Sequence, residues 1–83
     1  MLSPERTSQL EQRAKEFEHA LQAFARMREK LLEKRKNSSD SAMLALDGML
    51  RVNARTIGAL QSGLELTRKE LRLEQRAGSA SQD

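Results

Sequence analysis

Histidine and cysteine, which often serve in acid–base, nucleophilic and metal chemistry, are nearly absent from this chain of 83 residues. The only imidazole belongs to His19, and the chain has no cysteine that could act as a nucleophile or a metal ligand. It contains neither an H-E-x-x-H metal motif nor a glycine-rich phosphate loop. Its glutamates alternate with lysines and arginines, which is typical of a solvated helix face. We therefore expect no enzyme activity, no catalytic or metal site and no cofactor.

A band of positive charge is the one feature suited to a nucleic acid. It consists of Arg26, Arg28, Lys30, Lys34, Arg35 and Lys36. Some DNA-binding proteins place a basic helix before a heptad repeat. Here Glu29 and Glu33 interrupt the band, and an apolar stripe from Phe17 to Phe24 precedes it. A net charge of +3 permits an acidic partner without requiring one. Binding to nucleic acid is therefore the less favoured alternative.

The composition predicts an all-α protein. Strong helix formers dominate, and the β-branched aliphatic residues are limited to Val52 and Ile57. The longest apolar run, Ala42 to Leu46, is much shorter than the roughly 20 residues that span a bilayer. The first residues also lack the apolar core of a cleaved signal peptide. We expect a cytoplasmic protein that does not insert into membranes.

Two parallel rows of residues dominate the second half of the chain, each recurring at alternating steps of three and four. The first row, which we call the seam, comprises Met43, Leu46, Leu50, Asn53, Ile57, Leu60, Leu64, Thr67 and Leu71. The second, which we call the outer row, comprises Ala42, Ala45, Met49, Val52, Thr56, Ala59, Gly63 and Leu66. This spacing places each row along one side of a helix. The combined surface is wider than one neighbouring helix covers, so we expect neighbours on more than one side.

The first half of the chain predicts a matching helix over residues 4–36. Ser3, Pro4 and Glu5 suit an N-cap, a first helical position and the positive end of the helix dipole. An apolar row follows, interrupted only at Arg28. Its members are Leu10, Ala14, Phe17, Leu21, Phe24 and Leu31.

Cap and turn residues at positions 37–41 predict a loop between two antiparallel helices. Asn37 can end the first helix in a left-handed conformation, and Ser39, Asp40 or Ser41 can cap the second. The second helix is predicted over residues 42–76, followed by a disordered tail at residues 77–83. The domain prediction is thus one helical-hairpin unit over residues 1–83. One unbroken helix through the loop is the alternative.

Four positions in the predicted second helix are unusual. Gly48, Gly58 and Gly63 each cost about 1 kcal/mol relative to alanine. Only Gly63 lies on the packing side, where it would let a neighbouring backbone approach. Asn53 either fixes the register of the packed helices or marks where the seam meets solvent.

The layout resembles the small two-helix co-chaperones of bacterial type III secretion systems. The resemblance rests on the chain length, the polar loop at residues 37–41 and a second arm rich in Ala, Leu and Gly, as at Ala42–Leu46 and Ile57–Leu60. It implies a hairpin that pairs with a helical-repeat chaperone and helps to keep the needle subunit unpolymerised. The first arm is more highly charged than this class leads us to expect. Needle subunits are also short hairpins, but usually have prolines in the loop.

These patterns predict a protein–protein interaction module, an adaptor or co-chaperone that binds and stabilises a helical partner. The predicted partner-binding residues are Met43, Leu46, Met49, Leu50, Val52, Asn53, Ile57, Ala59, Leu60, Gly63 and Leu64. Closure of the hairpin is assigned to Leu10, Phe17, Leu21, Phe24 and Leu31. The alternative is a homodimer in which two hairpins form a four-helix bundle that serves as a scaffold.

Overall fold

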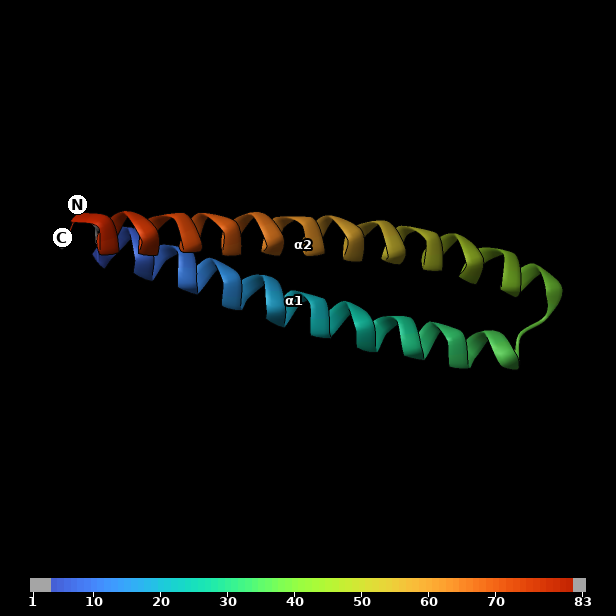
Figure 1. The fold of residues 1–83 in the computed structure, drawn as a ribbon. Coiled ribbons are helices and arrows are strands. Elements are labelled where there is room, and N and C mark those ends of the chain that lie inside the picture. Colours follow the sequence, from blue (N-terminus) through green and yellow to red (C-terminus); the bar gives the residue numbers. More distant parts are fainter. Residues whose placement is uncertain (1–3, 82–83) are drawn as a thin grey trace.

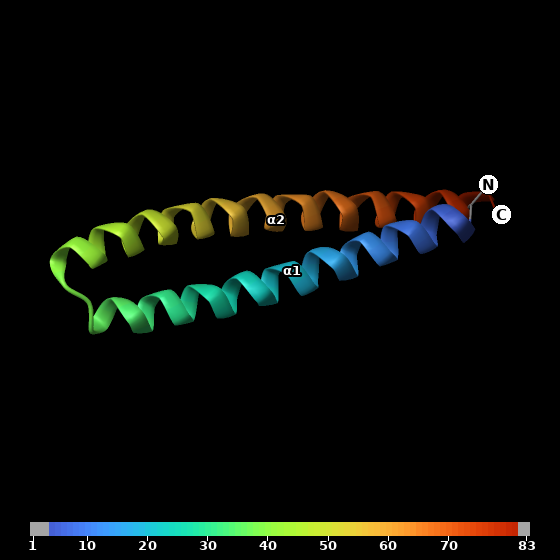
Figure 2. The same cartoon turned by 180° about the vertical axis from the view of Figure 1, so that it is seen from behind.

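The chain forms a helical hairpin. The computed structural model describes the backbone of residues 4–81 and the side chains of residues 4–77. This part of the chain consists of α1 (Pro4–Lys36) and α2 (Asp40–Ser81), with no strand. The two helices run antiparallel and side by side, so that α1 begins beside the end of α2 (Figures 1 and 2). The predicted all-α helical hairpin is confirmed.

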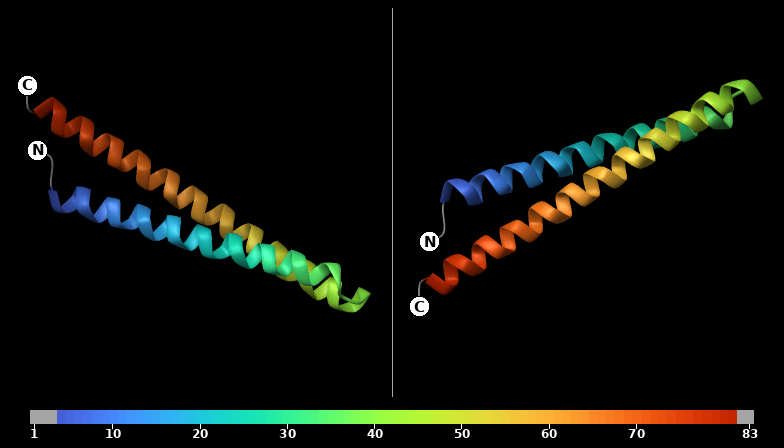
Figure 3. Two further views of the ribbon diagram at one scale, coloured as in Figure 1. Left: turned by 90° about the horizontal axis from the view of Figure 1, so that it is seen from below. Right: turned by 90° about the horizontal axis from the view of Figure 1, so that it is seen from above.

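The hairpin is a thin rod. Its principal extents are 65 × 14 × 14 Å, and its radius of gyration is 18.8 Å. A compact domain of the same length has a radius of gyration of about 12 Å. The helices are inclined to one another, since they separate toward the loop in Figure 1 and toward the chain ends in Figure 3. Such an inclination is expected where two helices pack through rows of side chains.

Local chemistry sets the bounds of α1. Pro4 occupies the first helical position, and Lys34, Arg35 and Lys36 place positive charge in the last turn. At this end Ser38 Oγ donates to the carbonyl of Lys34 at 2.6 Å, and the Asn37 N–H donates to the same oxygen at 3.2 Å. No non-glycine residue in the described range has a positive φ, so the prediction of a left-handed Asn37 is wrong. The predicted cap, Ser3, lies outside the described residues.

Ser39 starts α2. Its carbonyl accepts from the Met43 N–H at 2.8 Å, and its hydroxyl accepts from the Ala42 N–H at 3.4 Å. The loop is therefore residues 37–39 rather than 37–41, and the alternative of one unbroken helix is wrong. Asp40 lies in the first turn of α2, where its negative charge complements the helix dipole.

The helix α2 continues to Ser81, beyond the end predicted at Arg76. The disordered tail predicted for residues 77–83 is therefore wrong for residues 77–81. Alanine has the highest helix propensity, and a single glycine weakens a helix without ending it. Gln82 and Asp83 lie outside the described residues.

The seam and the apolar row of α1 form the interior between the helices. Leu10, Ala14, Leu31 and Leu64 are its buried apolar side chains, and Asn53 and Thr67 are its buried polar ones. The remaining seam residues and the remaining members of the apolar row of α1 are half-buried. The core is thus one side chain deep and thin.

Gly63 receives the ring of Phe17. A Cβ atom added to Gly63 would lie 2.6 Å from Cε1 and Cζ of that ring, which is closer than such atoms approach. The neighbour that the glycine admits is thus an aromatic side chain, not a backbone. Gly48 and Gly58 have no such neighbour, since nothing lies within 4 Å of an added Cβ.

We predict that Gly63→Ala and Gly58→Ala change stability in opposite directions. Gly63→Ala should lower the free energy of unfolding by about 1–3 kcal/mol, because Phe17 must move. Gly58→Ala should raise it by up to about 1 kcal/mol, because only helix propensity changes. Urea unfolding followed by circular dichroism measures both. An equal gain in the two variants would contradict the packing of Phe17 on Gly63.

Candidate partner-binding face

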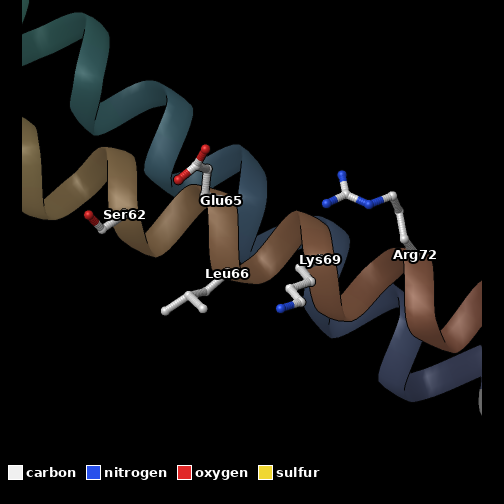
Figure 4. Close-up of a pocket in the computed structure, with 5 residues that line it drawn as sticks. All are labelled: Ser62, Glu65, Leu66, Lys69 and Arg72. Carbon is white, nitrogen blue, oxygen red and sulfur yellow. The ribbon is translucent and has the colours of Figure 1, made fainter.

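The described residues do not converge on a reactive centre. They contain no group of three or more His, Cys, Asp or Glu side chains placed to hold a metal ion. The side chain of His19 is exposed on α1. A shallow hollow on α2 is lined by Ser62, Glu65, Leu66, Lys69 and Arg72, all from one helix (Figure 4). Their side chains spread outward rather than toward a common point, so this hollow lacks the shape of a substrate site.

The seam residues predicted to bind a partner lie inside the hairpin. Seven of the predicted partner-binding residues belong to this group: Met43, Leu46, Leu50, Asn53, Ile57, Leu60 and Leu64, and each is buried or half-buried. We therefore reassign these residues from partner binding to closure of the hairpin, because a side chain that packs on α1 is not free to meet another protein. They meet the predicted closing residues of α1, of which Leu10 and Leu31 are buried and Phe17, Leu21 and Phe24 half-buried.

The outer row stays open. Met49 is 54% exposed, Val52 63% and Leu66 62%, although all three are large apolar side chains. Ala42, Ala45 and Ala59 are exposed as well. Figure 4 shows Leu66 directed to the outside of α2. Of the predicted partner-binding residues, Met49, Val52 and Ala59 are therefore accessible, whereas Gly63 is half-buried by Phe17.

Two ion pairs identify the edges of the hairpin. Arg6 Nη2 lies 2.8 Å from Glu70 Oε2, and Arg68 Nη2 lies 3.1 Å from Glu18 Oε1. Glu70 and Arg68 flank the seam on opposite sides, so the pairs mark two edges, which we call the Glu70 edge and the Arg68 edge. Steps of seven residues stay on one side of a packed helix.

The outer row belongs to the Glu70 edge. Counting back in sevens from Glu70 gives Gly63, Thr56, Met49 and Ala42. Counting forward in sevens from Arg6 along α1 gives Arg13, Ala20, Met27 and Lys34. Met27 is 47% exposed, so the middle of α1 adds apolar surface next to the outer row.

Two exposed large apolar residues of α2 were missed in the sequence. Leu73 is 55% exposed and follows Leu66 by seven residues, so it extends the outer row. Counting seven residues on from Leu66 would have identified Leu73, but the charged Arg72 and Glu74 beside it hid the pattern. Leu44 is more exposed still and belongs to neither row. A single exposed leucine of this kind is common on protein surfaces.

The Arg68 edge is hollowed, and its lining mixes charged and apolar side chains. Two shallow hollows there share Arg28 and Ala54. They arise where Arg28 interrupts the apolar row of α1 and where Ala25 and Ala54 are too small to fill the space. Their lining combines Glu29, Asp47, Arg51 and Gln61 with the apolar Leu32, Leu50 and Ile57. The repeated row of large exposed apolar side chains is on the other edge, where Met49, Val52, Leu66 and Leu73 lie.

Asn53 ties the two helices together. It is 3% exposed, which excludes the interpretation that it marks where the seam meets solvent. Its Nδ2 donates to the carbonyl of Phe24 at 3.0 Å, while its buried Oδ1 has no partner among the described residues. A polar group held this way favours one register over shifted ones, at some cost in stability.

The ion pair between the helices that lies nearest the loop joins Arg35 and Asp47. Nε of Arg35 donates to Oδ1 of Asp47 at 2.7 Å, and both side chains remain partly exposed. This hydrogen bond is the main cause that lowers the pKa of Asp47 from its ordinary 3.8, and the charges of Arg35 and Arg51 add to it. The same contact raises the pKa of Arg35.

No family model, curated protein or solved structure matches this chain. No helix in the described part of the chain is long and apolar enough to cross a membrane. The function of the hairpin must therefore be argued from its own surface.

We predict that Asn53→Leu raises the free energy of unfolding by about 1 kcal/mol. The variant removes a buried oxygen that has no partner, and the Phe24 carbonyl keeps its bond within α1. Asn53→Ala is the control, and it should be destabilised because it leaves a cavity. Urea unfolding distinguishes these outcomes. A leucine variant less stable than the wild type would show that the Asn53 bond outweighs its buried oxygen.

We predict that the Arg35–Asp47 pair makes stability depend on acid pH. The pKa of Asp47 is lower in the hairpin than in the unfolded chain, so its contribution is complete above the ordinary value of 3.8. It is lost as the pH falls through the lowered pKa. Thermal unfolding of the wild type and Asp47→Asn between about pH 6 and about pH 2 tests this. The stability difference between them should shrink in acid, and a constant difference would contradict the pair.

Proposed function

We propose that the hairpin is a non-catalytic interaction module that binds a helix of another protein through its outer row. The observation that carries this proposal is the exposure of Met49, Val52 and Leu66 in one row on α2. Contiguous apolar surface of this kind marks interaction sites. Apolar positions at steps of three and four suit contact with another helix.

The exposed area supports the same function. The chain exposes 6492 Å² at a mass of 9.4 kDa. A compact monomer of that mass exposes about 5,000 Å². The excess exceeds the roughly 800 Å² per partner that a stable interface covers. A partner can therefore contact the hairpin along its length while the interior between α1 and α2 stays packed.

A small core gives the partner a second role. The hairpin buries few apolar side chains, and domains this short gain little stability from their own core. A bound helix would add apolar contacts along α2 and stabilise the hairpin by mass action. Mutual stabilisation of this kind is what co-chaperones and assembly adaptors provide. The type III secretion co-chaperones that the layout resembles would work in this way, and that pathway stays a prediction.

We predict that aspartate on the outer row abolishes partner binding without unfolding the hairpin. Val52→Asp and Leu66→Asp change exposed positions, so the unfolding free energy should stay within about 0.5 kcal/mol of the wild type. The tagged wild-type chain should purify from its source cells with one helical protein in a stoichiometric complex, measured by light scattering. The double variant should not form that complex.

Gln61→Asp is the matched control. Gln61 is exposed on the Arg68 edge of the same helix, so the same new charge should leave the complex intact. Retention of the complex by the Val52→Asp, Leu66→Asp variant would show that the outer row is not the binding face.

A further inference from the structure

Basic side chains border the outer row on both sides. On α2, Arg55, Lys69 and Arg76 each follow an apolar side chain by three residues, namely Val52, Leu66 and Leu73. Side chains three residues apart are neighbours on a helix surface. Figure 4 shows Leu66 and Lys69 on the same side of α2. The outer row therefore has one basic flank on the side away from α1.

The second flank lies on α1. At the Glu70 edge this helix presents Arg13, Lys30 and Lys34, with Glu16 as the acidic exception. All four side chains are exposed. Glu70 itself is paired with Arg6. The surface that borders the outer row is thus mainly positive on both helices.

The side chains of these flanking cations do not form ion pairs or hydrogen bonds within the described part of the hairpin. In the described part of the chain the ion pairs involve Arg6, Arg35, Lys36 and Arg68, none of which is a flanking cation. The side chains of the six flanking cations, Arg13, Lys30, Lys34, Arg55, Lys69 and Arg76, form no ion pair or hydrogen bond there. They can therefore pair with a ligand at no cost to existing contacts.

We infer that the occupant of the outer row is an amphipathic helix with an apolar stripe bordered by Asp and Glu. This inference rests on the proposed function and adds the chemistry of the partner. The apolar stripe would cover Met49, Val52 and Leu66. The acidic borders would pair with the flanks on α1 and α2, which sets the orientation of the helix and rejects basic competitors.

A second copy of the chain fits this face poorly. In a symmetric pair related by a two-fold axis, antiparallel α2 helices would set the flank of Arg55, Lys69 and Arg76 against itself. Packing α2 on α1 of the other copy would instead oppose that flank to Arg13, Lys30 and Lys34. Both arrangements place like charges together, which disfavours association.

A nucleic acid also fits poorly. The basic flanks run on either side of exposed apolar side chains, so phosphates held by the flanks would cover Val52 and Leu66 with charge. The chain has no Trp or Tyr, and its two Phe residues lie between the helices, so the outer row offers no ring on which bases could stack.

Two synthetic peptides test the inference. Both have about 30 residues, the length of the outer row, and the same leucine–alanine stripe. One carries Glu beside the stripe and the other carries Lys. Fluorescence anisotropy with the full chain should give at least about tenfold tighter binding of the Glu peptide at about 0.05 M salt. The preference should shrink at about 0.5 M salt, where exposed charges are screened.

Charge reversal supplies the matched variants. The triple variant Arg55→Glu, Lys69→Glu, Arg76→Glu should lose or reverse the preference for the Glu peptide. The variant Lys15→Glu, Arg26→Glu, Lys36→Glu changes the net charge equally but lies away from the outer row, and it should keep the preference. Circular dichroism verifies that each variant is helical.

Four results would overturn the inference. Equal binding of both peptides would show that only the apolar stripe matters, and this result would leave the proposed function intact. A chain that sediments as a dimer and binds neither peptide would assign the face to a second copy. A duplex DNA that displaces the Glu peptide would assign it to nucleic acid. Binding of no probe by a monomeric chain would contradict the proposed function as well.

Discussion

A single neighbouring helix can cover only one side of α2, and this constraint determines which surfaces of the hairpin are buried. The chain gives α2 two adjacent apolar rows, but α1 covers mainly the seam and touches the outer row where Phe17 packs on Gly63. Phe17 packs on Gly63, and the Phe24 carbonyl accepts from Asn53, so the same face of α1 is held toward α2 at two points. The ion pairs at Glu70 and Arg68 hold the two edges. Together these contacts oppose rotation of α1 about its axis or a shift toward the outer row, which therefore stays open.

The same contacts explain how much of the structure could be predicted from the sequence. The apolar steps of three and four residues are enough to predict the two helices, and the cluster of cap residues is enough to predict the loop between them. From the sequence, residues of both rows were assigned to partner binding, because both rows have the same periodicity. Which row packs on α1 depends on shape, for instance on the space above Gly63 that the ring of Phe17 fills. The end of α2 was missed because local composition suggested a tail, whereas the helix continues to Ser81.

The two faces of α2 have different chemistry, in keeping with different tasks. The seam carries large aliphatic residues and Asn53, which suit a permanent contact with a defined register. The outer row mixes alanine with Met49, Val52 and Leu66 and is bordered by unpaired cations, which suits a contact that forms and dissociates. Charged flanks act mainly on the rate and selectivity of association, while the apolar row supplies the contact area. A hairpin with a thin core and one open face is well suited to act as half of a larger helical assembly.

The central claim is that the seam is closed and the outer row open in the chain alone. Thiol labelling tests it directly, because the chain contains no cysteine and single cysteines can be introduced at chosen sites. Thr67→Cys and Val52→Cys are close in size to the residues they replace, which are 2% and 63% exposed. The account predicts that Val52→Cys reacts as fast as a free thiol, while Thr67→Cys reacts more slowly by about 100-fold or more, because reaction requires local opening. Similar rates at the two sites would contradict it, either because the hairpin is not closed or because the outer row is already covered.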